Sequence, residues 1–246
     1  MSLDHSEVKI VLCVPGMWKD REELAAQIAK LSGGYFFVGE NLVHSETNTS
    51  FELEVRDPDS RMAHAFRSAG PHWANSPEME RIGAHTMGTY LIGKGGTTSG
   101  AEKTMLAASS LLYSGGLGVK VESSGIAHSP SDWIQMTDMR HCFTPHRAFV
   151  VYVYGDETYS CGMHNLGYRD AIIKSGFADD AIELIKQFTQ YLFRESPEIH
   201  VGHTFGVETG APRYRMTEES CRQYSEGHLF NNPYGMWRLT PVAQKC

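Results

Sequence analysis

Two hydrophobic periodicities alternate along the N-terminal half of the chain. The run Val8 to Val14 is apolar over the length of one strand and ends at a Pro-Gly pair, which predicts a buried β-strand. From Asp20 to Leu31, apolar residues recur at helical spacing, and Asp20 and Glu23 are spaced as a capping box. These residues therefore predict a strand followed by a capped helix.

The alternation continues through Val121. Tyr35 to Val43 and Phe51 to Arg56 indicate two strands, and the second alternates apolar with charged residues. Prolines interrupt residues 57 to 81, where we expect a short helix over Arg61 to Arg67 and then a loop. The next strand, helix and strand are expected at Ile82 to Ile92, Gly100 to Tyr113 and Leu117 to Val121.

The order of these elements predicts the fold class. A β-α-β-β run, an insert and a second β-α-β run resemble ferredoxin-like split β-α-β units with an added hairpin or loop. We therefore expect an α+β fold in which an antiparallel or mixed sheet carries its helices on one face.

The whole chain is expected to divide into four parts. Residues 1–122 are the α+β half just described, and residues 123–146 are a polar connecting segment with a short helix after Ser129-Pro130. Residues 147–216 predict a second α+β half packed on the first, and residues 217–246 a C-terminal tail that lies over the body. In the second half we expect a hairpin of Ala148 to Tyr154 with Thr158 to Met163, an amphipathic helix over Phe177 to Arg194, and a closing strand over Ile199 to Val207. The tail contacts are expected at Tyr234 and Trp237.

The stretch GGTTSGAEKT, Gly95 to Thr104, raises the question of a phosphate-binding loop. A P-loop requires its lysine directly after the second glycine, but two residues separate Gly100 from Lys103. Two residues turn the lysine about 200° around a helix, and Glu102 adds a negative charge near the place where a phosphate would lie. Ser99 and Glu102 instead have capping-box spacing. We therefore interpret the stretch as the start of a helix.

Composition excludes several classes of function. The 246 residues suffice for one large domain or two small ones. A formal charge of −7, with no cluster of Lys or Arg, gives no electrostatic footprint for a nucleic acid, and no long apolar run predicts a membrane span. The five cysteines include no CxxC pair, so we expect neither a disulfide framework nor a thiolate zinc site. No basic region precedes Val8, so we expect no signal peptide there, and we expect a cytoplasmic protein.

Twelve histidines make a metal site worth considering, although their spacing gives no known motif. His200 and His203 fall on opposite faces of a regular strand, and no HExxH is present. His85 reads as a core histidine on a strand. A metal-dependent hydrolase is nevertheless the alternative hypothesis. Its divalent metal would draw ligands from His128, His141, His146, His164, His200 and His203, oriented by carboxylates such as Asp132 or Glu208.

Nucleophile motifs are also missing from the sequence. No GxSxG elbow occurs. Cys161 has His164 three residues away, which places the two on opposite faces of a strand and favours a core cysteine.

A pattern of turns in the second half is similar to a known family. The segments LAASSLLYSGGLGVKVESSGIAHSPSDWIQM, TYSCGMHNLGYRDAII and HVGHTFG span about residues 105 to 210 and resemble a family of uncharacterised bacterial α+β domains of unknown function. The resemblance implies a similar fold and a bacterial cytoplasm, but no activity. The family's acidic residues after the LG turn are replaced here by Arg169-Asp170. The pattern carries over to His128, Ser129, Pro130, Thr158, Gly162, Leu166, Gly167, His203, Thr204 and Gly206.

Caps and turns thus account for the glycines, while motifs for phosphate, acyl-transfer and thiolate-metal chemistry are missing. We therefore expect a non-catalytic α+β protein that binds an unknown protein partner or a small ligand, without a cofactor, nucleic acid or membrane; a homodimer is compatible with this. The candidate binding residues are His128, Ser129, Asp132, His164, Arg169, His203 and Thr204. One exposed aromatic patch at Trp73, Trp133 or Trp237 would favour a partner surface.

Overall fold

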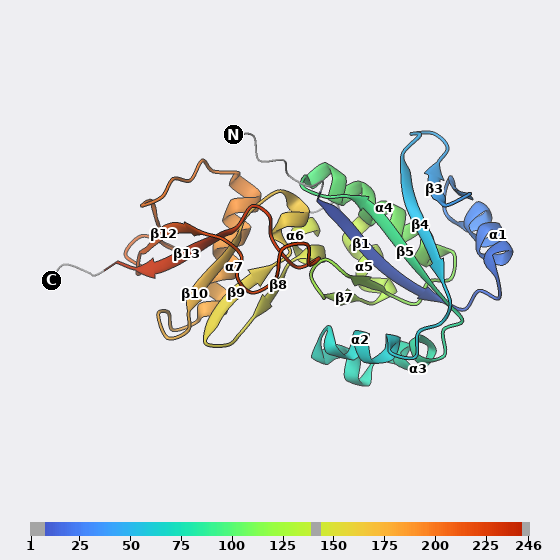
Figure 1. Cartoon of the computed structure of the whole chain (residues 1–246), viewed down its shortest axis with the longest axis horizontal. Coiled ribbons are helices and arrows are strands. Elements are labelled where there is room, and N and C mark those ends of the chain that lie inside the picture. Colours follow the sequence, from blue (N-terminus) through green and yellow to red (C-terminus); the bar gives the residue numbers. More distant parts are fainter. Residues whose placement is uncertain (1–7, 139–143, 243–246) are drawn as a thin grey trace.

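The computed structural model describes residues 8–138 and 144–242 and shows an α+β protein with two mostly antiparallel sheets (Figure 1). The first sheet belongs to the N-terminal half and the second to the C-terminal half, and they lie side by side along the long axis. Across the described ranges, no helix has the length and apolarity to cross a membrane.

The first sheet has seven strands in the order β2-β3-β4-β5-β1-β6-β7. The predicted first strand is confirmed as β1 (Lys9–Gly16), which lies between the antiparallel strands β5 (Met87–Lys94) and β6 (Val119–Val121). Its central position explains the continuous apolar run, because both faces are covered. The remaining strands are β2 (Tyr35–Val38), β3 (Asn41–His44), β4 (Ser50–Arg56) and β7 (Ala127–His128).

The second sheet has six strands in the order β11-β12-β13-β10-β9-β8. The predicted hairpin is confirmed as β8 (Val151–Val153) and β9 (Glu157–Cys161). Strand β13 (Met236–Pro241) comes from the segment expected to lie over the body, yet it is an interior strand. It pairs in parallel with β10 (Asp170–Lys174) and antiparallel with β12 (Tyr214–Glu219). The short strand β11 (Thr204–Phe205) forms the edge of this sheet.

Two predicted helices begin at aspartate caps. Helix α1 (Arg21–Leu31) follows Asp20, whose carboxylate accepts a hydrogen bond from the Glu23 backbone N–H at 2.9 Å. Helix α7 (Ala181–Glu195) follows Asp180, which accepts from the Glu183 N–H at 2.9 Å. Phe177, expected inside α7, therefore precedes it. The short helices α5 (Pro130–Asp138) and α6 (Thr144–Phe149) lie between the two sheets in the chain.

The glycine-rich stretch is confirmed as the start of a helix, but its predicted cap is wrong by two residues. Helix α4 (Thr98–Tyr113) is capped by Thr97, whose hydroxyl accepts a hydrogen bond from the Gly100 N–H at 3.0 Å. Ser99 already lies within the helix, so it cannot cap it with Glu102. The reason is that Thr97 takes the extended conformation of a cap, with φ −151°.

Several expected strands are shorter than predicted. The strand expected over Leu117 to Val121 is only β6, and the one expected from Ala148 begins at Val151, because α6 continues to Phe149. Tyr35 to Val43 divides into β2 and β3, because Gly39 turns the chain with φ +58°. In the range Ile82 to Ile92, the first two residues still belong to helix α3 (Glu78–Gly83), and the strand begins only at Met87. Ile199 to Val207 contributes only β11. The residues expected as loop before α3 also hold the 3-10 helix η1 (Pro71–Asn75), after the confirmed short helix α2 (Met62–Ser68).

Helices cover both faces of the first sheet, which corrects the expectation of one covered face. Leu12 and Val14 of β1 belong to the main core together with α4, whereas Cys13 belongs to a second core with residues of α2, η1 and α3. Successive strand residues point to opposite faces. The insert after β4 therefore packs as a helical unit beneath the sheet, as Figure 1 shows.

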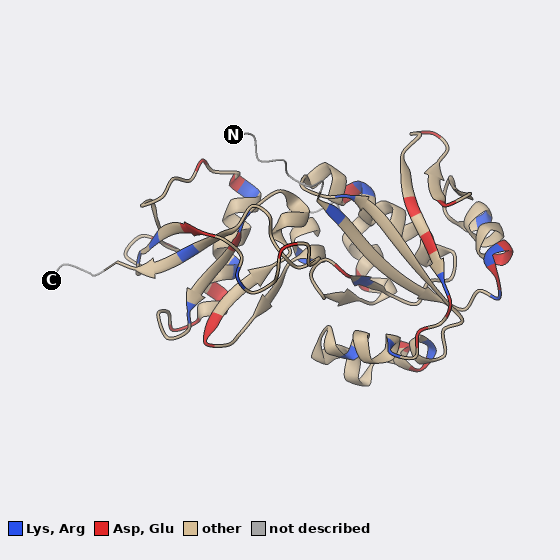
Figure 2. Ribbon diagram, viewed as in Figure 1, with Lys and Arg blue, Asp and Glu red and all other residues tan. Residues whose placement is uncertain are grey.

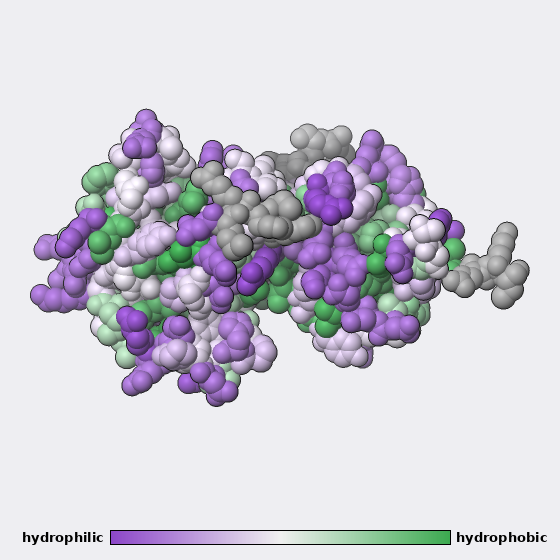
Figure 3. All heavy atoms as spheres, turned by 180° about the vertical axis from the view of Figure 1, so that it is seen from behind, coloured by the Kyte–Doolittle hydropathy of each residue, from purple (hydrophilic) through white to green (hydrophobic). Residues whose placement is uncertain are grey.

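The aromatic patch expected of a partner surface does not form at the three tryptophans. Trp73 and Trp133 have no exposed surface, and Trp237 retains only 6%. Figure 2 shows both signs of charge scattered over both halves. The reverse face consists of two lobes that meet at a narrower middle, with hydrophobic residues visible between hydrophilic ones (Figure 3).

Candidate functional site

The two halves meet at the 3-10 helix η2 (Met163–Leu166). The glycine-rich stretch before α4 packs directly on it, and the Gly96 N–H donates a hydrogen bond to the Asn165 carbonyl at 3.1 Å. Gly167, with φ +90°, lies so close that a Cβ there would fall 2.4 Å from the Gly96 carbonyl oxygen. The stretch that resembled a phosphate cradle therefore joins the halves.

The segment Ser220–Gly235, between β12 and β13, closes over this junction and is here called the strap. Its anchor is Asn232, whose side-chain amide donates to the Asp170 carboxylate at 2.7 Å and to the Tyr168 carbonyl at 3.0 Å. Burial raises the pKa of Asp170 to about 6, although hydrogen bonds from Asn232 and Ser160 oppose the shift.

Aromatic contacts hold the middle of the strap. The hydroxyls of Tyr224 and Tyr159 lie 3.1 Å apart, and the ring of Phe230 packs against Gly125. Between the strap, the start of β1 at Lys9 and the end of β12 lies an open groove of about 910 Å³, here called the junction groove. Two of the residues predicted from the sequence, His164 and Arg169, line it.

His164 is buried, with 2% of its surface exposed, at the inner side of the junction groove. Burial lowers the pKa of its imidazole from 6.5 to about 4, and the Leu229 backbone opposes this shift only in part. The Leu229 contact lacks the geometry of a hydrogen bond, so neither ring nitrogen has a partner within the described residues. The neutral ring thus leaves one donor and one acceptor unused.

The described chain holds other buried polar atoms without partners. Among the residues that the structure describes, they are the hydroxyls of Ser123 and Ser124 and the side-chain oxygen of Asn165. Asn165 and Ser124 both lie near Gly162, two residues before His164: the Asn165 amide donates to the Gly162 carbonyl at 3.0 Å, and a Cβ on Gly162 would lie 2.9 Å from the Cβ of Ser124. Because buried polar groups are normally satisfied, this concentration marks the junction as unusual.

Arg169 lies on the rim of the junction groove. Its guanidinium forms an ion pair with Glu218 at 3.2 Å and lies 5.2 Å from the ring centre of Trp237. Both charged side chains of the pair are partly exposed, Arg169 by 30% and Glu218 by 45%. Lys9, Glu218 and Asn232 were not among the residues predicted from the sequence. For Asn232, the available signal was its place close to Tyr234, one of the two expected tail contacts.

His128, Ser129 and Asp132 lie together at the entry of α5, but their polar atoms are engaged within the fold. The His128 Nε2 lies 2.9 Å from the Ala148 carbonyl, and burial lowers the pKa of the imidazole to about 4. The Ser129 hydroxyl accepts from the Asp132 N–H at 3.1 Å and donates to the Asp132 carboxylate at 2.8 Å. Ser129 thus acts as the N-cap of α5, and Asp132 holds its hydroxyl in place.

His203 and Thr204 line a second open groove, of about 710 Å³, between α7 and the edge strand β11. The rings of His200 and His203 are 5.2 Å apart, and His200 pairs with Glu198 at 3.3 Å. All of these side chains are largely exposed. The structure therefore distributes the predicted binding residues over three separate places.

Five of the six histidines of the metal hypothesis lie in the described part of the chain, and these five are likewise dispersed. His128, His146 and His164 are buried in different surroundings, His200 and His203 are adjacent at the surface, and His141 lies outside the described residues. Over residues 8–138 and 144–242, no group of three His, Cys, Asp or Glu side chains is arranged to hold a metal. His85 is a core histidine as expected, although it precedes the strand; its Nε2 accepts from the Asp59 N–H at 3.1 Å.

Comparisons with known proteins do not add to this geometry: no protein-family model, curated protein or solved structure matches the chain. The junction groove and its residues are therefore the features from which a function can be argued.

Proposed function

We propose that the protein is a non-catalytic binding protein and that the junction groove receives a small ligand or a short segment of a partner. The observation that carries this proposal is the imidazole of His164, buried in the wall of an open groove with both nitrogens unpaired within the described chain. Leaving a buried polar group without a hydrogen bond costs about 1–3 kcal/mol. A ligand that supplies the missing partners recovers that free energy on binding.

The shape of the site also supports binding. Ligand sites are usually concave and place a few polar groups so that they fix the orientation of the ligand. The junction groove combines His164 and Arg169 with backbone of the strap, and the Asn232 anchor holds that backbone in place. Both residues were candidates from the sequence, and they come from the loop that the resemblance also marks.

A fragment screen by amide chemical-shift mapping tests this function. We expect bound fragments to shift the amide resonances of His164, Arg169 and Gly235. The variant Arg169→Met should weaken the binding of these fragments. The matched control is Arg67→Met, since Arg67 is an exposed arginine on α2, outside the groove. A screen in which no fragment of any charge perturbs the junction groove would rule out the proposed function.

The finer features of the fold belong to the same proposal. We propose that the first half is built on a ferredoxin-like split unit, because β4, β5, β1 and β6 are neighbours in this order and all three pairings are antiparallel. The inserted β2–β3 hairpin then extends the sheet. Membership of the uncharacterised bacterial family, a cytoplasmic location and a homodimer remain predictions from the sequence.

A further inference from the structure

The junction groove already holds one carboxylate against its arginine. Glu218 pairs with Arg169 across 3.2 Å, and both side chains remain partly exposed to solvent. Exposed ion pairs of this kind contribute little to stability. A carboxylate from outside, able to make two parallel hydrogen bonds to the guanidinium, can therefore replace Glu218 at small cost.

A second cation lies in the same groove. Lys9 is exposed at the start of β1 and has no ion pair within the described ranges. The neighbouring Glu219 does not offset it, because Arg238 donates to both of its carboxylate oxygens at 2.6 and 2.9 Å. Among the groove residues, the remaining carboxylate without a described ion pair is Glu226 on the strap. Once Glu218 is displaced, two cations, Lys9 and Arg169, face the ligand.

The inner wall of the junction groove, at His164, favours a neutral polar group of the ligand. His164 offers one donor and one acceptor in a site from which water is largely excluded. A hydroxyl or an amide satisfies such a ring, because each can donate and accept. The groove thus presents cations at its rim and a neutral hydrogen-bonding ring within.

We propose that the ligand of the junction groove is a small carboxylate that displaces Glu218 from Arg169, is attracted by Lys9, and places a neutral polar group against His164. This inference rests on the proposed function and specifies the chemical class of its ligand. Glu218 then acts as an internal competitor that keeps Arg169 ordered when no ligand is bound.

Matched pairs of carboxylate fragments and their primary amides test the inference by NMR titration. We expect the carboxylates to bind and the amides to bind at least tenfold more weakly, since hydrogen bonds to charged groups contribute about 1.5–3 kcal/mol. Lys9→Met should weaken carboxylate binding up to about fivefold, and added salt should weaken it further.

Glu218→Gln is the sharper variant, because it predicts a gain. Removing the competitor should tighten carboxylate binding up to about fivefold, with no change for the amides. Glu198→Gln, at the second groove, is the matched control and should change neither. A gain of affinity cannot result from misfolding, so this variant remains informative if Arg169→Met is unstable.

The outcomes separate the two proposals. Amides that bind in the groove as tightly as their carboxylates would overturn the ligand class and leave the binding function standing, as would a loss of carboxylate affinity in Glu218→Gln. An absence of any binding in the groove would remove the function and the ligand class together.

Discussion

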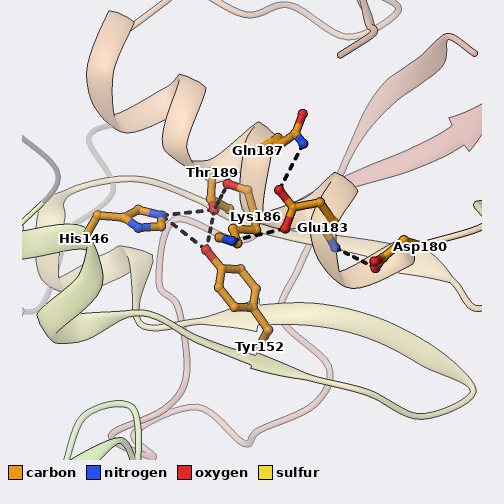
Figure 4. Close-up of polar contacts among 7 residues, drawn as sticks. All are labelled: His146, Tyr152, Asp180, Glu183, Lys186, Gln187 and Thr189. Carbon is orange, nitrogen blue, oxygen red and sulfur yellow. Dashed lines mark hydrogen bonds and ion pairs between the residues drawn. The ribbon is translucent and has the colours of Figure 1, made fainter. Parts of the chain in front are cut away.

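His146 and His164 are two buried histidines with opposite surroundings. His146 is 4% exposed and His164 is 2% exposed, and burial lowers the pKa of each imidazole to about 4. The Nε2 of His146 lies 3.0 Å from the hydroxyl of Thr189, which is also 3.0 Å from the hydroxyl of Tyr152 (Figure 4). His164 has no such partners within the described chain.

The difference shows that two sites in the same half of the molecule use the same side chain in different ways. The network of His146 joins α6, β8 and α7 and so fixes the long helix on its sheet (Figure 4). The ring of His164 is equally buried, but it has no hydrogen-bond partner among the described residues, and the Leu229 backbone lies beside it. A buried polar group that the fold leaves unpaired is a reason to expect that the residue has a role other than stabilising the fold.

The largest expected effect is a loss of stability in acid, which both histidines share. Their pKa lies below the unfolded value of 6.5, so the unfolded chain binds more protons, and stability falls as the pH falls from about 6.5 to about 4. Each ring contributes about 3 kcal/mol to this fall, at 1.36 kcal/mol per pKa unit. Asp170 acts in the opposite direction between about 6 and 3.8, because its pKa is raised.

Urea unfolding at a series of pH values measures the fall, and imidazole NMR titrations assign it. We expect the rings of His146 and His164 to stay neutral down to about pH 4.5. A ring that titrates near 6.5 in the folded protein would show that its site is hydrated, and would contradict the lowered pKa of that histidine.

The next effect separates the two sites. Thr189→Val keeps the shape of the side chain but removes the hydroxyl that His146 and Tyr152 share. We expect the free energy of unfolding to fall by about 1–3 kcal/mol, because His146 and Tyr152 each lose a buried partner and keep only their mutual contact at 3.4 Å. Thr189→Ser keeps the hydroxyl and should lose less. Ligand binding in the junction groove should not change, and a loss of binding would couple two sites that we describe as independent.

Local structure was largely predictable from the sequence, whereas the site was not. Asp20 and the apolar spacing of α1 identify that helix without further information, since a cap and a helical stripe are local features. Strand β13 could not be placed in this way: Met236 pairs with Asp170, far away in the chain, and nothing local identifies a partner. Similarly, Ser99 and Thr97 both have side chains that can cap a helix. In the folded chain Thr97 is the cap, and the preceding Gly96 is hydrogen-bonded to Asn165 of η2, which the local sequence does not reveal.

The junction groove combines all of these long-range contacts. His164 and Arg169 were sequence candidates because both lie in the loop from Gly162 to Arg169. Their shared groove exists only because the strap returns to Asp170 through Asn232. His128 was an equal candidate from the sequence, but its Nε2 is hydrogen-bonded to the Ala148 carbonyl. Burial without a partner separates His164 from His128, and only the folded chain reveals that property.

The smallest expected effect on stability is also the most specific. His164→Leu replaces the unpaired ring with an apolar side chain of similar size, so no hydrogen bond is lost and the desolvation of two nitrogens is avoided. We expect the free energy of unfolding at pH 7 to change by less than about 1 kcal/mol, within the range in which apolar replacement is neutral or stabilising. The corresponding change His146→Leu should cost about 1–3 kcal/mol, because Thr189 and Tyr152 lose a partner.

Urea unfolding of both variants, with NMR titration of a carboxylate fragment, completes the comparison. His164→Leu should be stable but should bind the fragment at least several-fold more weakly, while His146→Leu should be less stable and bind it normally. If His164→Leu instead destabilised the protein as much as His146→Leu, its ring would have a structural partner. The proposal that His164 serves ligand binding in the junction groove would then be contradicted. A site maintained for binding requires the opposite pattern, in which the residue most expendable for folding is the one that binding needs.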